Sequence, residues 1–441
     1  MSITVPFSAT GAGGPGLPRQ RPPGGPEIAV APLVSVVSAI REGTARTRPE
    51  LLDATGLSRK IVTQRVDQAI DLGLLEEGEL APSGGGRQAR IVRFRARSGV
   101  VAAALLGASE FTVGLADLNG RLLDSSHEDW AIDAGPHATL DRVRAHIDAL
   151  LRRHRVTRPW GIALGLPGPV EFATGTVTLP PIMPGWDGFA PRHWLREHFD
   201  APVWVDNDVN LMALGEWTRG DDVRGRDLLF IKVGTGIGAG QIAHGRLIHG
   251  QTGAAGDIGH IHVSDRSRAC RCGRTGCLEA VAGGWALLLD AAERRAESPF
   301  LAERYARRGH LVLGDIGEAV TAGDPVATAL TTRSADHVAD VVANLVNFTN
   351  PGIVVLGGGV LRAGDVLVDR VRAIVAERCT EPVLRSLEIR SASLDHQEGV
   401  IGAALMAAEN LFSSSALLRW VEGGTPFGRA TEIQRAADAF V

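Results

Sequence analysis

Residues 228–240 read LLFIKVGTGIGAG, a mostly apolar run followed by glycines that alternate with small residues. The first six residues have the length and apolar content of a buried strand, and glycine permits a tight turn after it. Elsewhere, predicted strands (Val100–Leu106, Phe111–Ala116, Trp160–Leu164, Ile353–Leu356) alternate with predicted helices (Leu140–Arg153, Ala335–Val346, Gly364–Glu377). This alternation of strands and helices predicts an α/β domain.

The length and composition of the chain exclude several classes of protein. Its 441 residues are too many for one ordinary hydrophobic core, so two or three domains are expected. No apolar stretch approaches the ~20 residues that cross a bilayer. Residues 1–30 are rich in Gly and Pro and lack the apolar centre of a signal peptide, which predicts a disordered tail and a cytoplasmic protein. The net charge of −4 argues against nonspecific coating of nucleic acid but allows a small basic reading head.

Residues 31–96 have the pattern of three helices and a hairpin ahead of the α/β part. The expected helices are Leu33–Arg41, a two-turn helix after Thr47, and Arg59–Leu72. Thr47 with Glu50 is a capping-box signature, and Ser58 is the expected N-cap of the third helix. A glycine-rich hairpin at Ser83–Arg95 would form a wing. This order predicts a winged helix-turn-helix.

The third helix and the wing are the candidate DNA reader. They offer the polar side chains of Arg59, Lys60, Thr63, Gln64, Arg65, Arg87 and Arg90. The helix residues can reach major-groove base edges and phosphates, while the wing arginines can approach the minor groove. One head reads only a few base pairs, so a homodimer or dimer of dimers on double-stranded operator DNA is expected. Nearby acids such as Asp67 and Glu76 favour the alternative, a winged helix that contacts protein.

Two further stretches carry a resemblance to a known family. Residues 234–240, continuing to GDIGH at 256–260, and the loop CRCGRTGCLE at 270–279 resemble the signature and the zinc loop of the ROK family of repressors and sugar kinases. The resemblance covers about residues 33–408. A winged helix-turn-helix ahead of the ROK domain is similar to the arrangement of the family's repressors, whereas its kinases usually lack such a head.

The resemblance implies an actin-like, sugar-kinase-like domain with two lobes. The small lobe would span residues 98–216 and be completed by about 391–411, and the large lobe with its zinc loop would span 217–390. The two halves are expected to echo each other. The remaining residues, 412–441, have a weak pattern and are expected to form a peripheral C-terminal extension.

Three of the four cysteines lie close together and predict a metal site. With His260, the thiols of Cys270, Cys272 and Cys277 supply the soft tetrahedral ligand set of a closed structural Zn²⁺ site. Such a site leaves no position for water, so zinc would serve folding and not hydrolysis. The alternative is a set of small buried side chains, but ligand spacings of this kind are a strong signal for metal.

By match to the motifs of the resembled family, five residues would contact a sugar: Asn207, Asp208, Asp257, His260 and Glu279. Carboxylates suit vicinal hydroxyls because each accepts two donors. With one ring nitrogen on the metal, His260 could turn the other toward the ligand. The family usually has Glu at position 257 and often has Asn at the position of Ile182. A solvated turn is the alternative for residues 206–208, and a plain core position is the alternative for Trp186, in a loop beside the same cleft.

The sequence argues against phosphoryl transfer. Kinases of the resembled family open with a strand that ends in Asp-x-Gly-Gly-Thr, which handles phosphate and magnesium. The same place here reads Leu105-Leu106-Gly107-Ala108-Ser109. Leucine cannot organise a metal-bound triphosphate, so nucleotide binding is expected to be poor. The glycine runs 234–240 and 357–359 are then expected to serve tight turns.

The sequence therefore predicts a sequence-specific transcriptional repressor that is no enzyme and whose operator affinity responds to a sugar or sugar derivative. Two alternatives stay open. The first is an ATP-dependent, glucokinase-like sugar kinase with an accessory DNA-binding head, in which Asp208 would be the catalytic base. The second is a DNA-binding protein whose kinase-like body only dimerises.

Overall fold

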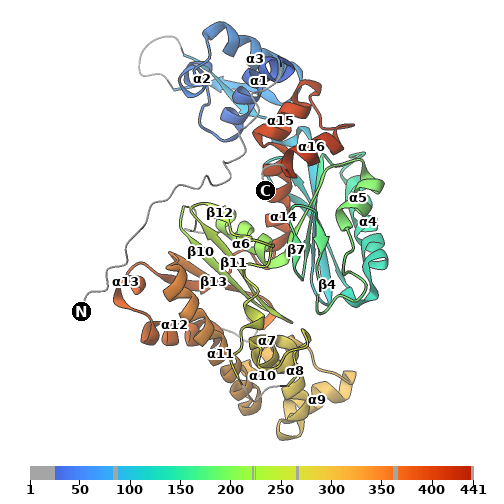
Figure 1. The fold of residues 1–441 in the computed structure, drawn as a ribbon, viewed down its shortest axis with the longest axis vertical. Helices are drawn as coiled ribbons and strands as arrows, with labels where there is room; N and C mark the ends of the chain where they lie inside the picture. Colours follow the sequence, from blue (N-terminus) through green and yellow to red (C-terminus); the bar gives the residue numbers. More distant parts are fainter. Residues whose placement is uncertain are drawn as a thin grey trace, which may run out of the picture.

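The computed structural model describes residues 25–82, 88–220, 223, 225–264, 268–360 and 366–438. Most of the predicted tail (1–24) and part of the predicted wing (83–87, with Arg87) lie outside the described residues. The chain forms a head at one end, followed by two lobes (Figure 1).

The head contains the three helices and the hairpin that the sequence predicts. These elements are α1 (Gly25–Arg41), α2 (Arg48–Thr55), α3 (Arg59–Asp71), β1 (Leu75–Leu80) and β2 (Arg90–Phe94). Thr47 caps α2 and Ser58 caps α3, with each hydroxyl accepting a backbone N–H three residues on. One boundary is wrong, because residues 25–30 belong to α1 and not to a tail. Pro32 lies inside that helix. Because proline usually interrupts a helix, the sequence did not predict the turns that precede it.

Each lobe is built on a mixed five-stranded sheet. The small-lobe sheet has the order β5 (Leu122–Asp129), β4 (Glu110–Asp117), β3 (Val100–Leu106), β6 (Gly161–Leu166), β9 (Val203–Asn207). The large-lobe sheet has the order β12 (Arg246–Leu247), β11 (Ile237–Ala243), β10 (Leu228–Val233), β13 (Ile353–Gly357), β14 (Glu388–Ser391). In both, the first three strands along the chain are antiparallel and the last two are parallel to the central strand. The predicted echo between the halves is confirmed.

Helices cover the outer faces of both sheets. In the small lobe these are α4 (Pro136–Arg153) and α5 (Pro191–Phe199), beside a short hairpin of β7 (Val170–Glu171) and β8 (Thr176–Val177). In the large lobe they are α7 (Leu278–Ala282), α8 (Gly284–Glu293), α9 (Pro299–Arg308), α10 (Leu313–Thr321), α11 (Pro325–Thr349), α12 (Val366–Arg378) and α13 (Glu381–Leu384). The long, largely buried α11 carries much of the large-lobe core.

Two helices, α6 (Asp208–Arg219) and α14 (Glu398–Leu411), lie side by side where the lobes meet. Helix α6 contacts β9 of the small lobe and β10 and β11 of the large lobe, whereas α14 packs on β3 and β6. Their backbones touch at glycines: a methyl group on Gly215 would lie 1.9 Å from the carbonyl oxygen of Glu398, and one on Gly402 would lie 1.8 Å from that of Leu211. Only residues without a side chain allow so close an approach.

The C-terminal helices α15 (Ser414–Trp420) and α16 (Ala430–Asp438) lie between the head and the small lobe (Figure 1). Leu417, Trp420 and Ile433 are fully buried in one hydrophobic cluster that also includes head and small-lobe residues. The ring of Trp420 meets the edge of Trp160 with 5.5 Å between centroids. The prediction that residues 412–441 are peripheral is wrong, because these helices bury large side chains. The helices are too short to show a clear hydrophobic period in the sequence.

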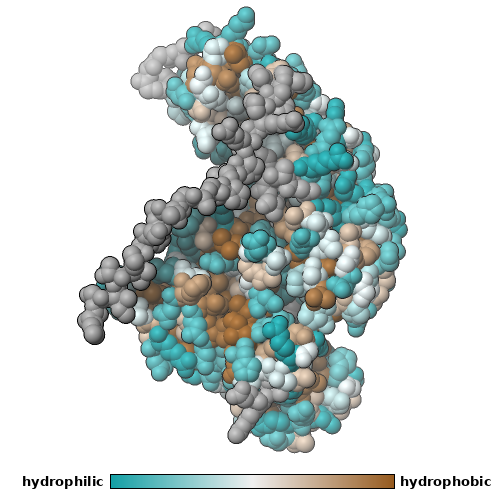
Figure 2. All heavy atoms as spheres, viewed as in Figure 1, coloured by the Kyte–Doolittle hydropathy of each residue, from teal (hydrophilic) through white to brown (hydrophobic). Residues whose placement is uncertain are grey.

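On the face shown in Figure 2, hydrophilic side chains cover most of the outer helices, and hydrophobic ones gather over the large lobe near β13 and α11. Phe348, near the end of α11, is 88% exposed.

Among the described residues, no single helix is long and apolar enough to span a membrane. One pair, Glu398–Leu411 with Ser414–Gly423, meets the length and composition together but is bent by 64°.

Candidate functional site

The four predicted metal ligands come together. The ligand atoms of His260, Cys270, Cys272 and Cys277 all lie within 4.8 Å of one another. Nδ1 of His260 is 3.6 Å from Sγ of Cys270, and Sγ of Cys272 is 3.7 Å from Sγ of Cys277. A tetrahedral ion bound at about 2.3 Å from sulfur and about 2.0 Å from nitrogen would hold its ligands about 3.5–3.8 Å apart. The group therefore fits a tetrahedral metal ion.

Without a cation, burial disfavours the thiolate form of Cys270. Burial raises the pKa of Cys270 to about 12, and the neighbouring thiols add to this rise. Three clustered thiols cannot all ionise alone, but a divalent cation binds them as thiolates and reverses the effect. With Nδ1 in the cluster, Nε2 of His260 is directed toward Asp257, 3.8 Å from its Oδ1.

The metal group is connected to the glycine run by Glu279, which follows Cys277 by two residues. One Glu279 oxygen accepts the backbone N–H of Ile237 at 3.1 Å, and the other accepts the indole N–H of Trp285 at 3.3 Å. A methyl group on Gly236 would lie 2.4 Å from the same carboxylate. Glu279 thus holds the turn before β11 in this structure, with both oxygens in use by the protein.

Residues 206–208 are not the solvated turn that the sequence allowed, because Asp206 and Asp208 are buried. Asn207 is the N-cap of α6: its side-chain oxygen accepts the N–H of Val209 at 2.9 Å. Its amide group donates to the carbonyl oxygen of Gly168 at 3.1 Å, which fixes a loop of the small lobe.

Asp208 has a partner that its neighbours in the sequence do not reveal. Its side chain is 4% exposed, and its Oδ2 pairs with Nζ of Lys232 on β10. Its Oδ1 accepts the N–H of Val209 at 2.8 Å. Both carboxylate oxygens are therefore occupied. A single cation inside the apolar strand LLFIKV was the signal that could have found this pair.

The predicted sugar contacts surround β11. A methyl group on Gly238 would lie 3.0 Å from Cγ2 of Val209, next to Asp208, and 4.0 Å from the carbonyl oxygen of Gly256, next to Asp257. The start of α6 and the loop before His260 thus both lie close to Gly238 of β11. The Asp257 side chain is 50% exposed and is the most open of these acids.

Leu105 occupies the end of β3, where the resembled kinases have aspartate. A methyl group on Gly165 would lie 2.7 Å from Cδ1 of Leu105, and one on Gly399 would lie 2.2 Å from its Cδ2. The leucine side chain is thus packed between β6 and the start of α14. Trp186, for which the sequence allowed two roles, is a core residue with no exposed surface.

A second ion pair, between the partly exposed His249 and the buried Asp206, lies next to Asn207. Nε2 of His249 lies 2.7 Å from Oδ2 of Asp206, and the imidazole lies against the ring of Phe172, with 4.5 Å between centroids and the planes tilted by 33°. Oδ1 of Asp206 accepts from the backbone of Asn207 at 2.7 Å and from Asn210 at 2.9 Å. His249 comes from a large-lobe loop, so the pair joins that loop to the end of β9. Nothing in the local sequence around His249 indicates it.

The His249–Asp206 pair predicts a pH dependence of stability. Burial alone would lower the pKa of His249, but the hydrogen bond and charge of Asp206 outweigh it and raise the pKa above 6.5. A raised pKa in the folded state stabilises most below pH 6.5, and this contribution is lost as pH rises through the folded pKa. The stability difference between wild type and His249→Gln, from urea unfolding, is expected to shrink from pH 5.5 to pH 8.5. A constant difference would contradict this.

In the head, four of the predicted DNA contacts share one exposed face. Arg59, Lys60, Thr63 and Gln64 are exposed on the first half of α3, and Arg90 is exposed on β2. Arg65 is half-buried and turned inward, because it donates to Gln68 at 2.6 Å and to the carbonyl oxygen of Ala29 at 3.3 Å. The acidic side chains of Asp67, Asp71, Glu76 and Glu77 line a separate hollow between α3 and β1.

Comparisons with known proteins agree with this architecture. The sequence model of the ROK family matches residues 101–410. A glucokinase of Halalkalibacterium halodurans is 37% identical over 252 residues, or 56% of this chain and 76% of that protein. A xylose repressor of Caldicellulosiruptor bescii is 26% identical over 383 residues, or 86% of this chain and 95% of that protein. A solved ROK family transcriptional regulator, a homologue of the Escherichia coli MLC protein, has a TM-score of 0.73 at 24% identity and covers 90% of this chain and 100% of its own. The predicted sugar-kinase-like fold is confirmed.

Proposed function

Because the chain belongs to the ROK family, we propose that it is a transcriptional repressor that binds operator DNA through its head and responds to a sugar or sugar derivative held between its lobes. The lengths of the alignments support a regulator. The alignment with the xylose repressor covers 383 residues. Even if it extends to the last residue of the chain, an alignment of this length includes part of the head. The glucokinase aligns over 56% of the chain.

The observation that carries the choice of regulator over kinase is the packed side chain of Leu105. It fills the space between Gly165 and Gly399 where a kinase needs a carboxylate for magnesium and phosphate. The Lys232–Asp208 pair supports the same conclusion, because a base whose oxygens are both engaged is poorly placed to accept a hydroxyl proton. Sugar binding by Asn207, Asp208, Asp257, His260 and Glu279 would then persist without transfer.

Two assays on the full chain separate regulator from kinase. Gel retardation with duplexes from the chain's own genomic neighbourhood is expected to give a specific complex that a sugar weakens or strengthens. A coupled ATPase assay with glucose, N-acetylglucosamine and xylose is expected to give no turnover above background. Phosphorylation of a sugar that is abolished by Asp208→Asn would instead favour the kinase. The 37% identity to a glucokinase supports that alternative.

The proposed DNA contacts predict graded losses in affinity. Gln64→Ala removes a base-edge contact and is expected to cost about 1–3 kcal/mol on the specific duplex, with little change on random DNA. Lys60→Ala removes a phosphate contact and is expected to weaken binding to both duplexes and to flatten the salt dependence. Fluorescence anisotropy at several salt concentrations measures both. Asp53→Ala, exposed on α2, is the control in the same head; if Gln64→Ala binds like it, the assigned face is wrong.

The remaining parts of the proposal follow from chemistry. The Cys₃His group would hold a structural Zn²⁺, because thiolates and imidazole in a closed tetrahedral set are what zinc prefers. Useful operator affinity requires two heads, so the protein would act as a homodimer or dimer of dimers in the cytoplasm. The exposed Phe348 is a candidate contact between copies.

A further inference from the structure

One C-terminal segment, residues 409–424, contacts the head at three points. The first is a charge pair at the end of α1: two guanidinium nitrogens of Arg41 donate to the carboxylate of Glu409 on α14, at 2.7 and 3.3 Å. The guanidinium also lies over the ring of Phe412, 4.8 Å from its centroid, and donates to the carbonyl oxygen of Leu118 in the small lobe at 3.5 Å. The Arg41 side chain is 8% exposed, so it depends on these partners, because a buried charge without a partner is costly.

The second and third points fix the wing strand and the third helix. The buried ring of Phe412 and the ring of Phe94, the last residue of β2, meet edge to face with 5.1 Å between centroids. A methyl group on Gly424, after α15, would lie 2.9 Å from the carbonyl oxygen of Leu72, the C-cap of α3. Only glycine allows so close an approach. The segment therefore contacts α1, β2 and α3.

These contacts lie away from the face that is proposed to read DNA. Gln64 is in the first half of α3, whereas Leu72 follows its last turn. Eight residues of α-helix separate the two positions by about 12 Å along the axis. Residues 409–424 would therefore act on DNA through the orientation of α3, and not by contact at its first half.

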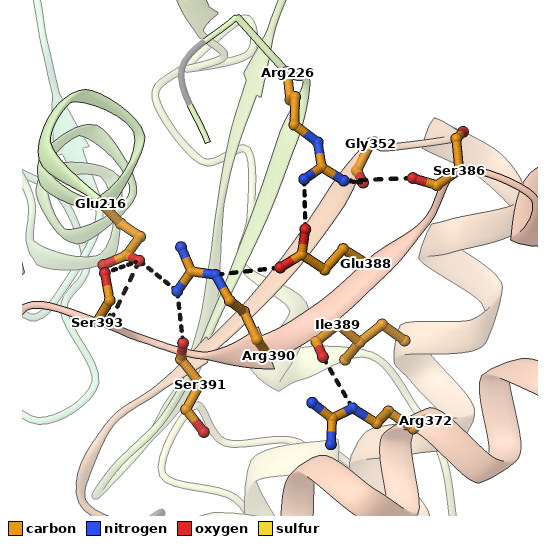
Figure 3. Close-up of polar contacts among 10 residues, drawn as sticks. All are labelled: Glu216, Arg226, Gly352, Arg372, Ser386, Glu388, Ile389, Arg390, Ser391 and Ser393. Carbon is orange, nitrogen blue, oxygen red and sulfur yellow. Dashed lines mark hydrogen bonds and ion pairs between the residues drawn. The ribbon is translucent and has the colours of Figure 1, made fainter. Parts of the chain in front are cut away.

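Helix α14 also connects this segment to the contact between the lobes. Its backbone at Gly402 lies against Leu211 of α6. Figure 3 shows what holds α6 to the large lobe: the fully buried Glu216 binds Arg390 of β14 at 2.7 Å and Ser393 at 2.8 Å. A movement of the large lobe would therefore be passed through α6 to α14 and, at the far end of α14, to the head.

We propose that Glu409, Phe412 and Gly424 are positioning residues of the DNA reader: they hold α1, β2 and α3 in one orientation on the small lobe, and specific binding of DNA depends on that orientation. The inference rests on the proposed function, since it needs a head that binds an operator. Two heads of one oligomer must meet two half-sites at a fixed spacing. A head that is free to turn has to be ordered when it binds, and this ordering lowers the affinity.

Two variants of the full chain test the inference without changing the proposed DNA face. Glu409→Lys places a cation beside the buried Arg41 guanidinium, and Phe412→Ala removes the ring that meets Phe94. Fluorescence anisotropy is expected to show about tenfold weaker binding of each variant to the duplex that wild type retards specifically. Binding to a random duplex is expected to change by less than about twofold, because the basic side chains of the proposed DNA face are unchanged. Phe412→Leu, which keeps an apolar side chain in this place, is expected to recover most of the loss.

Hydrogen exchange followed by mass spectrometry gives a second readout that needs no DNA. The amides of α1 and α3 are expected to exchange faster in Glu409→Lys and Phe412→Ala than in wild type, because local opening costs less when packing contacts are lost. The matched control is Glu422→Lys, which makes the same change of charge at an exposed position of the same segment and is expected to behave as wild type. Thermal unfolding checks that the variants fold. The Glu409 side chain is 63% exposed, so its substitution leaves the core intact.

The outcomes separate this inference from the proposed function. Specific binding by Glu409→Lys and Phe412→Ala that matches the Glu422→Lys control would overturn the inference, whatever the exchange rates. If wild type retards no duplex, the proposed function fails, and the exchange rates decide on the segment alone. Faster exchange in the two variants then supports its hold on the head, and equal exchange overturns it.

Discussion

Gly402→Ala is expected to lower the free energy of unfolding by about 3 kcal/mol or more, because the new methyl group has no room. It would lie 1.8 Å from the carbonyl oxygen of Leu211 and 2.9 Å from the backbone nitrogen of Gly215. Both atoms are backbone of α6, so neither can rotate away. The two helices would have to move apart, which would weaken the contact between the lobes. Urea unfolding and the Tm measure the loss.

Gly314→Ala is the matched control. Gly314 lies in the first turn of α10, where an added methyl group would have nothing within 4 Å, and it does not need a positive φ. Alanine there is expected to change stability by less than about 1 kcal/mol, in the stabilising direction. A Gly402→Ala protein as stable as the Gly314→Ala protein would show that α6 and α14 are farther apart than described.

Cys277→Ser is expected to empty the proposed zinc site and to destabilise the large lobe by about 3 kcal/mol or more, since binding energy of a structural zinc is folding energy. Cys277 is fully buried and directly precedes α7, so its loss also frees Glu279 from the turn at Ile237. Elemental analysis of the purified protein gives the metal content. Urea unfolding with and without a chelator gives the stability.

Cys379→Ser is the control for this prediction. Cys379 is also buried, but it lies outside the Cys₃His group, and its thiol donates to the carbonyl oxygen of Ala343 at 3.4 Å. Serine there is expected to leave the metal content unchanged and to cost about 1 kcal/mol. Metal retained in Cys277→Ser, or wild type indifferent to the chelator, would refute the assignment.

Local signals made much of the fold predictable. The strands Val100–Leu106 and Leu228–Val233 coincide with β3 and β10 because a buried strand reads as a short apolar run. The caps Thr47 and Ser58 are correct because a hydroxyl three residues before a free N–H is a local interaction. The Cys₃His group could be found because its spacing is rare in sequences without metal.

Contacts between distant segments were not predictable in this way. Lys232 and Asp208 are separated by 24 residues and His249 and Asp206 by 43, and only the fold brings each pair together. The role of residues 412–441 was missed for the same reason, since short helices show their purpose only when their partners are in place. The roles of the predicted sugar and DNA contacts stay predictions, because they depend on molecules outside the chain.

The position of α15 and α16 between the head and the small lobe has a consequence for the synthesis of the chain. The ribosome synthesises α1 first, but the surface that Trp420 and Ile433 cover stays open until the final residues emerge. At ordinary elongation rates of about 5–20 residues per second, the head waits about 20–80 s for its last neighbours. An mRNA that is truncated by a few dozen codons would therefore yield a nearly full-length chain with an exposed apolar surface, which quality-control proteases can recognise.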